Sequence, residues 1–213
     1  MKTDDLIAML ANGVAPVDTN ATRKRFQTAV LWGVLGALVV MLSGYGLRHD
    51  LQLAAAMPMF WLKLAFPLAV AIPAGMLTLR LSRPGMGLGH AWVALPLPWL
   101  AIATLAMATL MDAAPAQRLP LVMGKTWLTC AFNIAWVSAP VLVGMLWAVK
   151  GMAPTRPALA GGCAGLAAAA TGAVVYALHC PEMDAPFLAV WYTLGMLIPA
   201  AVGALAGAKW LRW

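Results

Sequence analysis

The sequence predicts an all-α polytopic membrane protein, with a six-transmembrane-helix bundle and a short cytoplasmic N-terminal helix. Three observations lead to this prediction: the composition, the number of long apolar runs, and the distribution of lysine and arginine. Of the 213 residues, 63% are hydrophobic and only 10% are charged, whereas a soluble domain carries about 25% charged residues. Because so few charges cannot cover an aqueous surface, we expect the chain to lie in a membrane.

Six stretches of about 20 apolar residues are each long enough to cross the hydrocarbon core. They cover approximately residues 26–45, 59–79, 91–111, 129–149, 158–178 and 187–208. Lys63 lies near the start of the second stretch, where we expect its stem to extend the ammonium to the lipid headgroups. Prolines occur inside four stretches, but neighbouring helices can satisfy the freed backbone groups. The connections are short, so we expect no second globular domain between the spans.

The basic residues indicate which side of the membrane each connection faces. If the N-terminus is cytoplasmic, the inside segments hold ten of the 14 lysines and arginines, and the outside segments hold four. Arg23, Lys24 and Arg25 directly precede the first stretch and form the strongest topology anchor. Six spans return the C-terminus to the cytoplasm, and the outer connections would face the periplasm if the membrane is the bacterial inner membrane. The net charge of +7 therefore reflects topology and not affinity for nucleic acid.

Residues 1–25 lack the apolar core of a cleavable signal peptide and predict a separate cytoplasmic segment before the transmembrane domain at 26–213. Asp4 and Asp5 suit the positive end of a short helix. Gly13 can close this helix and Pro16 stops it. The segment therefore predicts a helix of about ten residues, which is marginal alone in water.

One face of this short helix carries Leu6, Ile7 and Leu10. An apolar stripe of this kind requires a membrane surface or a groove on another protein. The acids at the start of the helix, and the lack of basic residues within it, disfavour an anionic membrane surface. We expect a protein partner; the alternative is a disordered tail that only places the basic triplet.

The outer ends of the fourth and fifth spans carry residues suited to binding a metal. The stretch "HCPEMD" at 179–184 follows the fifth span, and Cys130 lies at the outer start of the fourth. Thiolates and imidazoles suit zinc or copper, and a carboxylate can complete such a set. Cys130, His179, Cys180 and Glu182 are therefore candidate ligands of a transition-metal ion such as zinc.

Two other interpretations of the same residues remain open. Cys130 and Cys180 could form a disulfide if their Cα atoms lie within about 7 Å, because the expected outer compartment lets disulfides persist. Alternatively, "HCPEMD" is a polar loop at a helix end and its cysteine is incidental. Cys163, near the inner end of the fifth span, is expected to pack as a small hydrophobe.

Glycine spacing predicts close packing between the fifth and sixth spans near the cytoplasmic side. Gly161 and Gly165 form one GxxxG pair, and Gly203 and Gly207 form another. Such pairs let two helix backbones approach each other in a membrane. We expect ordinary static packing there.

Several short motifs, in their joint order, resemble the NrsF-like family of six-span membrane anti-sigma factors. These are "TDDLIAMLANGVAPV" at 3–17, Arg25, Cys130, "CPE" at 180–182 and "WYTLGMLIP" at 191–199. The resemblance covers essentially the whole chain.

The resemblance implies a membrane-bound anti-sigma factor that holds an extracytoplasmic-function sigma factor away from RNA polymerase. Leu6, Ile7 and Leu10 would face the sigma factor. Cys130 and Cys180 would be periplasm-facing thiols that sense metal or oxidative stress and trigger release. No enzymatic activity is implied.

Two other function classes are considered from the residues. A thiol-disulfide membrane oxidoreductase usually needs a closely spaced cysteine pair and a relay pair, whereas the two outer cysteines are far apart in sequence. A small metal transporter tends to bury ionisable residues in mid-membrane, whereas the charges inside these spans lie at their ends. No hydrolytic motif or phosphate-binding loop occurs in the sequence.

Overall fold

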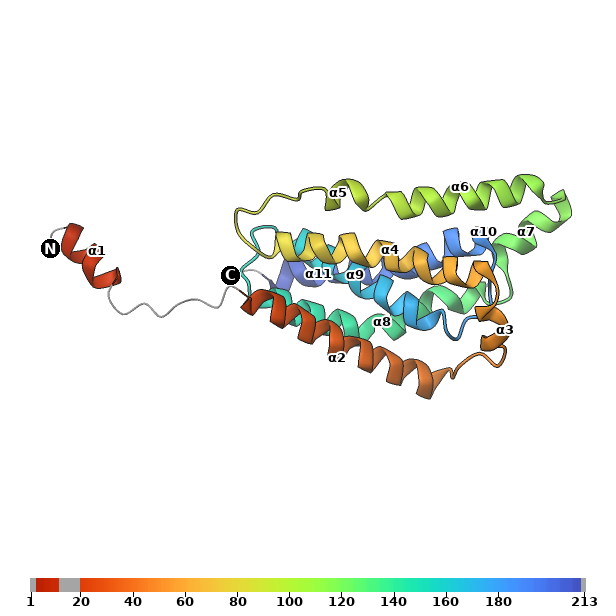
Figure 1. Cartoon of the computed structure of the whole chain (residues 1–213), viewed down its shortest axis with the longest axis horizontal. Helices are drawn as coiled ribbons and strands as arrows, with labels where there is room; N and C mark the ends of the chain where they lie inside the picture. The colour runs from red at the N-terminus through yellow and green to blue at the C-terminus, as the bar shows by residue number, and fades with distance from the viewer. Residues whose placement is uncertain (1–2, 12–19, 212–213) are drawn as a thin grey trace.

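The six predicted spans are present in the structure (Figure 1). The computed structural model describes residues 3–11 and 20–211, and every regular element in this part of the chain is a helix. The stretches that are long and apolar enough to cross a membrane are Ala21–Gly44, Pro58–Leu81, Ala91–Asp112, Pro115–Lys150, Pro157–Tyr176 and Ala185–Trp210. The short N-terminal helix is also confirmed, as α1 (Thr3–Ala11).

The remaining helices follow the predicted order with additions in the connections. They are α2 (Ala21–Gly44), α3 (Leu51–Ala55), α4 (Pro58–Leu81), α5 (Ala91–Ala94), α6 (Leu97–Asp112), α7 (Pro115–Met123), α8 (Trp127–Lys150), α9 (Pro157–Tyr176), α10 (Ala185–Phe187), the π-helical turn η1 (Leu188–Tyr192) and α11 (Thr193–Trp210). The sequence did not predict α3 or α7. They extend the bundle at the end where α2 finishes and α4 begins (Figure 1).

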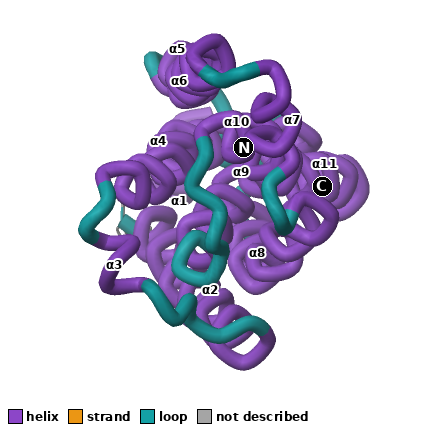
Figure 2. Tube along the Cα trace, turned by 90° about the vertical axis from the view of Figure 1, so that its right-hand side faces the viewer, coloured by secondary structure: helices purple, strands orange, loops and turns teal. Residues whose placement is uncertain are grey.

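Helix α9 forms the centre of the bundle, where it packs against α4, α8 and α11 (Figure 2). In its most apolar stretch 67% of the residues are buried, against 11% in the span formed by α5 and α6. The reason lies in its sequence, which is rich in alanine and glycine from residue 158 to 173. Small side chains let several neighbouring helices approach the same central helix at once.

The predicted close contact between the fifth and sixth spans is confirmed at the glycine pairs of α9 and α11. A Cβ atom added to Gly161 would collide with the carbonyl oxygen of Gly203. One added to Gly165 would collide with the carbonyl oxygen of Pro199. Because the obstructing atoms belong to the backbone, only glycine fits at these positions.

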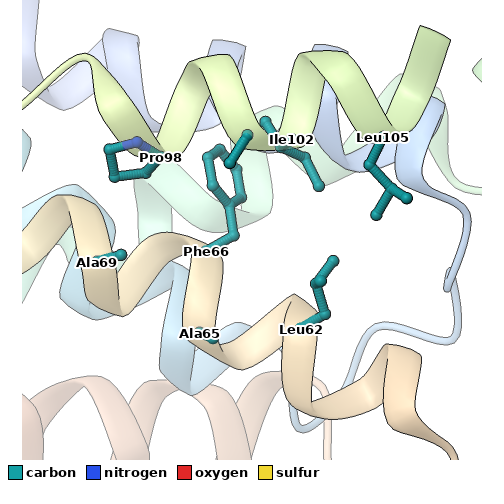
Figure 3. Close-up of a pocket in the computed structure, with 8 residues that line it drawn as sticks. Leu62, Ala65, Phe66, Ala69, Pro98, Ile102 and Leu105 are labelled. Carbon is teal, nitrogen blue, oxygen red and sulfur yellow. The ribbon is translucent and has the colours of Figure 1, made fainter. Parts of the chain in front are cut away.

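The span formed by α5 and α6 is less tightly held. An apolar crevice of about 200 Å³ separates α6 from α4, and Leu62, Phe66, Ile102 and Leu105 point into it (Figure 3). The span is also interrupted, because α5 ends at Ala94 and α6 begins at Leu97. Pro96 lies in this interruption, and a proline removes a backbone hydrogen bond and clashes with the preceding turn.

Candidate functional site

The two predicted sensor thiols lie together at one end of the bundle, which we call the thiol end. Cys130 is in the first turn of α8, where its backbone N–H donates to the carbonyl of Thr126 at 2.9 Å. Cys180 follows α9, and its N–H donates to the carbonyl of Tyr176 at 3.0 Å. Both side chains are fully buried and both are free thiols.

The surroundings of Cys180 favour its thiolate form. A hydrogen bond from the Cys130 thiol is the largest influence that lowers the pKa of Cys180, which falls to about 6 although burial acts in the opposite direction. The positive charge of Lys63, the backbone N–H of Glu182 and the Tyr192 hydroxyl lower this pKa further. A thiol whose pKa lies below the ambient pH is present largely as the nucleophilic and metal-binding thiolate.

Lys63 belongs to this site, which corrects the expectation that its side chain extends to the lipid headgroups. The residue is fully buried in α4. Its Nζ donates to the carbonyl oxygens of Cys180 at 2.6 Å and of Glu182 at 2.7 Å. It also lies 5.7 Å from the centre of the Tyr192 ring. Backbone carbonyls therefore replace water around this ammonium, as a buried charge requires.

Glu182 is buried, and its carboxylate accepts hydrogen bonds at the start of α8. The Oε1 atom accepts the backbone N–H groups of Lys125 at 2.7 Å and Thr126 at 3.0 Å, and the Thr126 hydroxyl at 3.2 Å. A carboxylate at this position also interacts favourably with the positive end of the helix dipole. Glu182 therefore links the segment after α9 to the helix that carries Cys130.

His179 packs against the loop that follows α2. Its Nδ1 lies 3.0 Å from the carbonyl oxygen of Gly46. The ring contacts Tyr45 and Tyr176, with centroid separations of 5.3 and 5.7 Å. In the same loop, Arg48 donates to the carbonyl of Cys180 at 3.3 Å. The loop thus covers the segment that contains Cys180.

Arg48 is also paired with Asp50, since Nε and Nη2 of the guanidinium each donate to a carboxylate oxygen at 2.7 Å. This hydrogen-bonded guanidinium lowers the pKa of Asp50 to about 2, and the same contact raises the pKa of Arg48. The pair is therefore fully charged at neutral pH and holds Arg48 over the Cys180 carbonyl.

Of the four candidate metal ligands, the structure brings the two thiols into contact and gives the other two side chains different partners. Glu182 accepts hydrogen bonds from residues at the start of α8, and His179 lies against Gly46. Within residues 3–11 and 20–211, no three histidine, cysteine, aspartate or glutamate side chains gather closely enough to hold a metal ion. The third cysteine, Cys163, lies in the α9 turn near the glycine pairs and away from this site.

Two site residues were missed by the sequence analysis. Lys63 is three residues from Phe60 and from Phe66, and all three are buried on one face of α4. This three-residue spacing was the only sequence signal that Lys63 shares a face with two buried aromatic residues. The signal was weak, because nearly all residues of this helix are apolar and polarity does not distinguish its inner face from its outer face. Tyr192 ends the π-helical turn η1, a local widening often found at functional sites. Its hydroxyl is buried without a well-formed hydrogen bond and lies beside Cys180.

The predicted partner-binding residues of α1 are helical and open to solvent. Asp4 and Asp5 occupy the first turn. Leu6, Ile7 and Leu10 are 38%, 59% and 64% exposed. Gly13 and Pro16, which were expected to close and stop this helix, lie outside the described residues.

The predicted anchor triplet, Arg23, Lys24 and Arg25, lies in the first turns of α2 and not before it. The Arg25 guanidinium donates to the Trp147 carbonyl at 3.0 Å and lies 4.1 Å from the centre of the Trp147 ring. This contact joins the start of α2 to the end of α8, at the end of the bundle opposite the thiols.

Comparison with known proteins agrees with the resemblance seen in the sequence. The family model described as negative regulator of sigma F matches residues 10–213. A protein of Azospira oryzae named probable anti-sigma-F factor NrsF is 49% identical over the whole length of both chains. A protein of Caulobacter vibrioides named anti-sigma-F factor NrsF is 36% identical, also over the whole of both chains. No solved structure matches the chain. With this coverage and identity, the chain belongs to the NrsF family of negative regulators of sigma F.

Proposed function

We propose that the protein is a membrane-bound anti-sigma factor that holds an extracytoplasmic-function sigma factor through α1 and releases it when Cys130 and Cys180 react with an oxidant or a metal. The names of the two relatives support a sigma factor as the partner. The observation that carries the sensing half of the proposal is the contact between two buried thiols that are 50 residues apart in sequence, with Cys180 activated.

The N-terminal half of the proposal rests on the exposed face of α1. Leu6, Ile7 and Leu10 are open to solvent on a nine-residue helix that buries none of its own residues. A short amphipathic helix gains stability by placing such a face in a partner's groove. Asp4 and Asp5, in the first turn of α1, would then lie at one end of that groove.

At the thiol end, oxidation is the simplest reaction that the arrangement supports. The two thiols lose two protons and two electrons to an oxidant and form one S–S bond. A zinc or similar ion would instead be held by the two sulfur atoms. Because His179 and Glu182 already have other partners, a full set of four protein ligands would require both side chains to turn.

Release requires that the reacted and unreacted forms have different affinities for the sigma factor. A change from about 99% bound to about 1% bound corresponds to a difference of roughly 10⁴ in affinity. Helix α9 is suited to carry the change, because it leads directly from the segment that contains Cys180 to the glycine contacts with α11. We propose that the thiol end faces the periplasm of the inner membrane and that both termini are cytoplasmic.

The first test removes residues 1–15. The truncated protein is expected to insert normally and to lose binding of the sigma factor, measured by co-purification from membranes. The double variant Ile7→Asp with Leu10→Asp should behave like the deletion, because it places charge on the exposed face. Full binding by both proteins would exclude α1 as the binding element.

The second test replaces each cysteine by serine. Cys130→Ser and Cys180→Ser are expected to abolish release of the sigma factor by diamide or by zinc, read as transcription from a sigma-dependent promoter. Cys163→Ser is the matched control and should respond normally. An equal effect of all three substitutions would rule out a dedicated thiol pair.

A further inference from the structure

The segment from Cys180 to Glu182 is irregular, yet it sets the position of a reactive thiol. It follows the last turn of α9 and contains Pro181. The proline ring fixes one backbone dihedral of this segment, and contacts from elsewhere must fix the rest. Besides the Arg48 contact described above, two contacts join the segment to two different helices.

The first contact comes from α4. The Lys63 ammonium donates to the carbonyl oxygens of Cys180 and Glu182, the two residues on either side of Pro181. Both distances are short, and the lysine is fully buried. Within the described part of the chain, no carboxylate forms an ion pair with Lys63. The two carbonyls are thus its principal partners, and the segment is tied to α4 at two points.

The second contact comes from α8. Glu182 directs its carboxylate to the backbone at Lys125 and Thr126, four to five residues before Cys130. The space for this carboxylate is set by Gly124, which has a positive φ of 57°. A Cβ atom on Gly124 would lie 2.7 Å from Oε2 of Glu182 and 2.6 Å from the Phe187 ring. Glycine is therefore needed here for both its conformation and its small size.

We propose that Lys63 and Glu182 form a clamp that positions Cys180 against Cys130, so that the two thiols react as a pair. Both are positioning residues, and the inference rests on the proposed thiol-sensing function. The clamp joins the helix that carries Cys130 and the segment that carries Cys180 to α4. Loss of either contact lets the segment move away from α8. A disulfide requires Cα atoms within about 7 Å, whereas a single thiol can be alkylated at any distance from the other. Movement of the segment therefore prevents the disulfide while each thiol can still react by itself.

The test compares two reactions of the purified full-length protein in a Cys163→Ser background. Diamide oxidises the thiol pair: its N=N bond accepts two protons and two electrons and becomes a hydrazine, while one S–S bond forms. N-ethylmaleimide instead adds to each thiol separately. Both rates are read for Cys130 and Cys180 by mass spectrometry of the digested protein. The ratio of the disulfide rate to the alkylation rate of Cys180 reports position independently of thiol activation.

For Lys63→Met and Glu182→Ala, the ratio of the disulfide rate to the alkylation rate of Cys180 is expected to fall at least tenfold. Gly124→Ala, which displaces the carboxylate without altering either clamp residue, should lower it in the same direction. Glu182→Gln keeps an amide oxygen able to accept the two N–H groups and should retain most of the wild-type ratio. Lys150→Met removes an exposed lysine at the far end of α8, and serves as the matched control with an unchanged ratio.

If Lys63→Met lowers the disulfide rate and the alkylation rate of Cys180 by the same factor, the lysine acts only by favouring the thiolate through its charge. That result would exclude the clamp. If Glu182→Gln is as defective as Glu182→Ala, the capping role of the carboxylate is wrong. A wild-type protein that forms no disulfide would overturn both the clamp and the proposed sensing. A wild-type disulfide that needs the clamp but leaves sigma-factor binding unchanged would support the clamp and overturn the sensing function.

Discussion

The two ends of the bundle are held together in different ways. At the thiol end, buried polar groups connect α4, α8 and the segment after α9 through hydrogen bonds from Lys63 and to Glu182. At the opposite end, α9 and α11 meet through glycine backbones with no side chain between them. Oxidation, protonation or metal binding can change the first kind of contact but not the second. The comparison indicates that the contacts at the thiol end can change with their chemical surroundings, whereas shape alone fixes the contact between α9 and α11 at the other end.

The largest expected effect on stability tests the glycine end. In Gly161→Ala the new methyl group collides with the backbone of Gly203, so α9 and α11 must separate. Overpacking of this kind costs about 1–3 kcal/mol, measured as the free energy of unfolding in bicelles. Gly75→Ala is the control, because a Cβ atom there meets nothing within 4 Å. Its stability should be unchanged or slightly raised, and equal losses in both variants would contradict the assigned packing.

The second prediction concerns the pH dependence of the thiol end. Since the pKa of Cys180 is lowered to about 6, the thiolate is present above this pH and is lost as the pH falls through it. Alkylation of Cys180 by iodoacetamide should therefore reach a plateau near pH 7 and fall roughly tenfold per pH unit below 6, whereas an ordinary cysteine has a midpoint near 8.5. The measurement is made on metal-free protein, with each cysteine read separately. A midpoint above 8 would show that the thiol is not activated.

The smallest effect is expected at the rim of the thiol end. Asp50→Asn removes the carboxylate that pairs with Arg48, but the Arg48 backbone N–H still donates to the Leu178 carbonyl at 3.2 Å. The Arg48 side chain is only 6% exposed, but the Asp50 side chain is 51% exposed, so water can replace its carboxylate. Ion pairs with such an exposed partner contribute little, and the rate of disulfide formation should stay within about twofold of wild type. A loss as large as that of Lys63→Met would extend the clamp to this loop.

The six spans could be predicted from the sequence because length and apolarity alone mark them. The predicted stretch 59–79, for example, differs from α4 (Pro58–Leu81) by only one or two residues at each end. The break between α5 and α6 was missed, since prolines inside a span, here Pro96 and Pro98, are compatible with either a continuous or an interrupted helix. Helix α7 was missed because the segment before α8 contains polar residues and two prolines at 115 and 120.

The thiol site was predicted only in part. The sequence placed Cys130 and Cys180 at the same end of neighbouring spans, and this topology brings them together. It could not show that Lys63 faces inward, because a lysine near a span end satisfies its charge equally well in the headgroups or on a buried carbonyl. The acceptors of Lys63 are 117 and 119 residues away in sequence, and no local pattern encodes such a distance.

That separation has a consequence for the order in which the protein is built. Lys63 leaves the ribosome long before the carbonyls of Cys180 and Glu182 exist, and at about 5–20 residues per second the interval is roughly 6–24 s. During this interval an unsolvated ammonium inside the bilayer would be costly, whereas a lysine near the end of a span can extend its charge to the membrane surface. The carbonyls that hold Lys63 in its buried position are present only once α9 and the following segment have been made. The buried contact between Cys130 and Cys180 thus cannot form until translation has passed the fifth span.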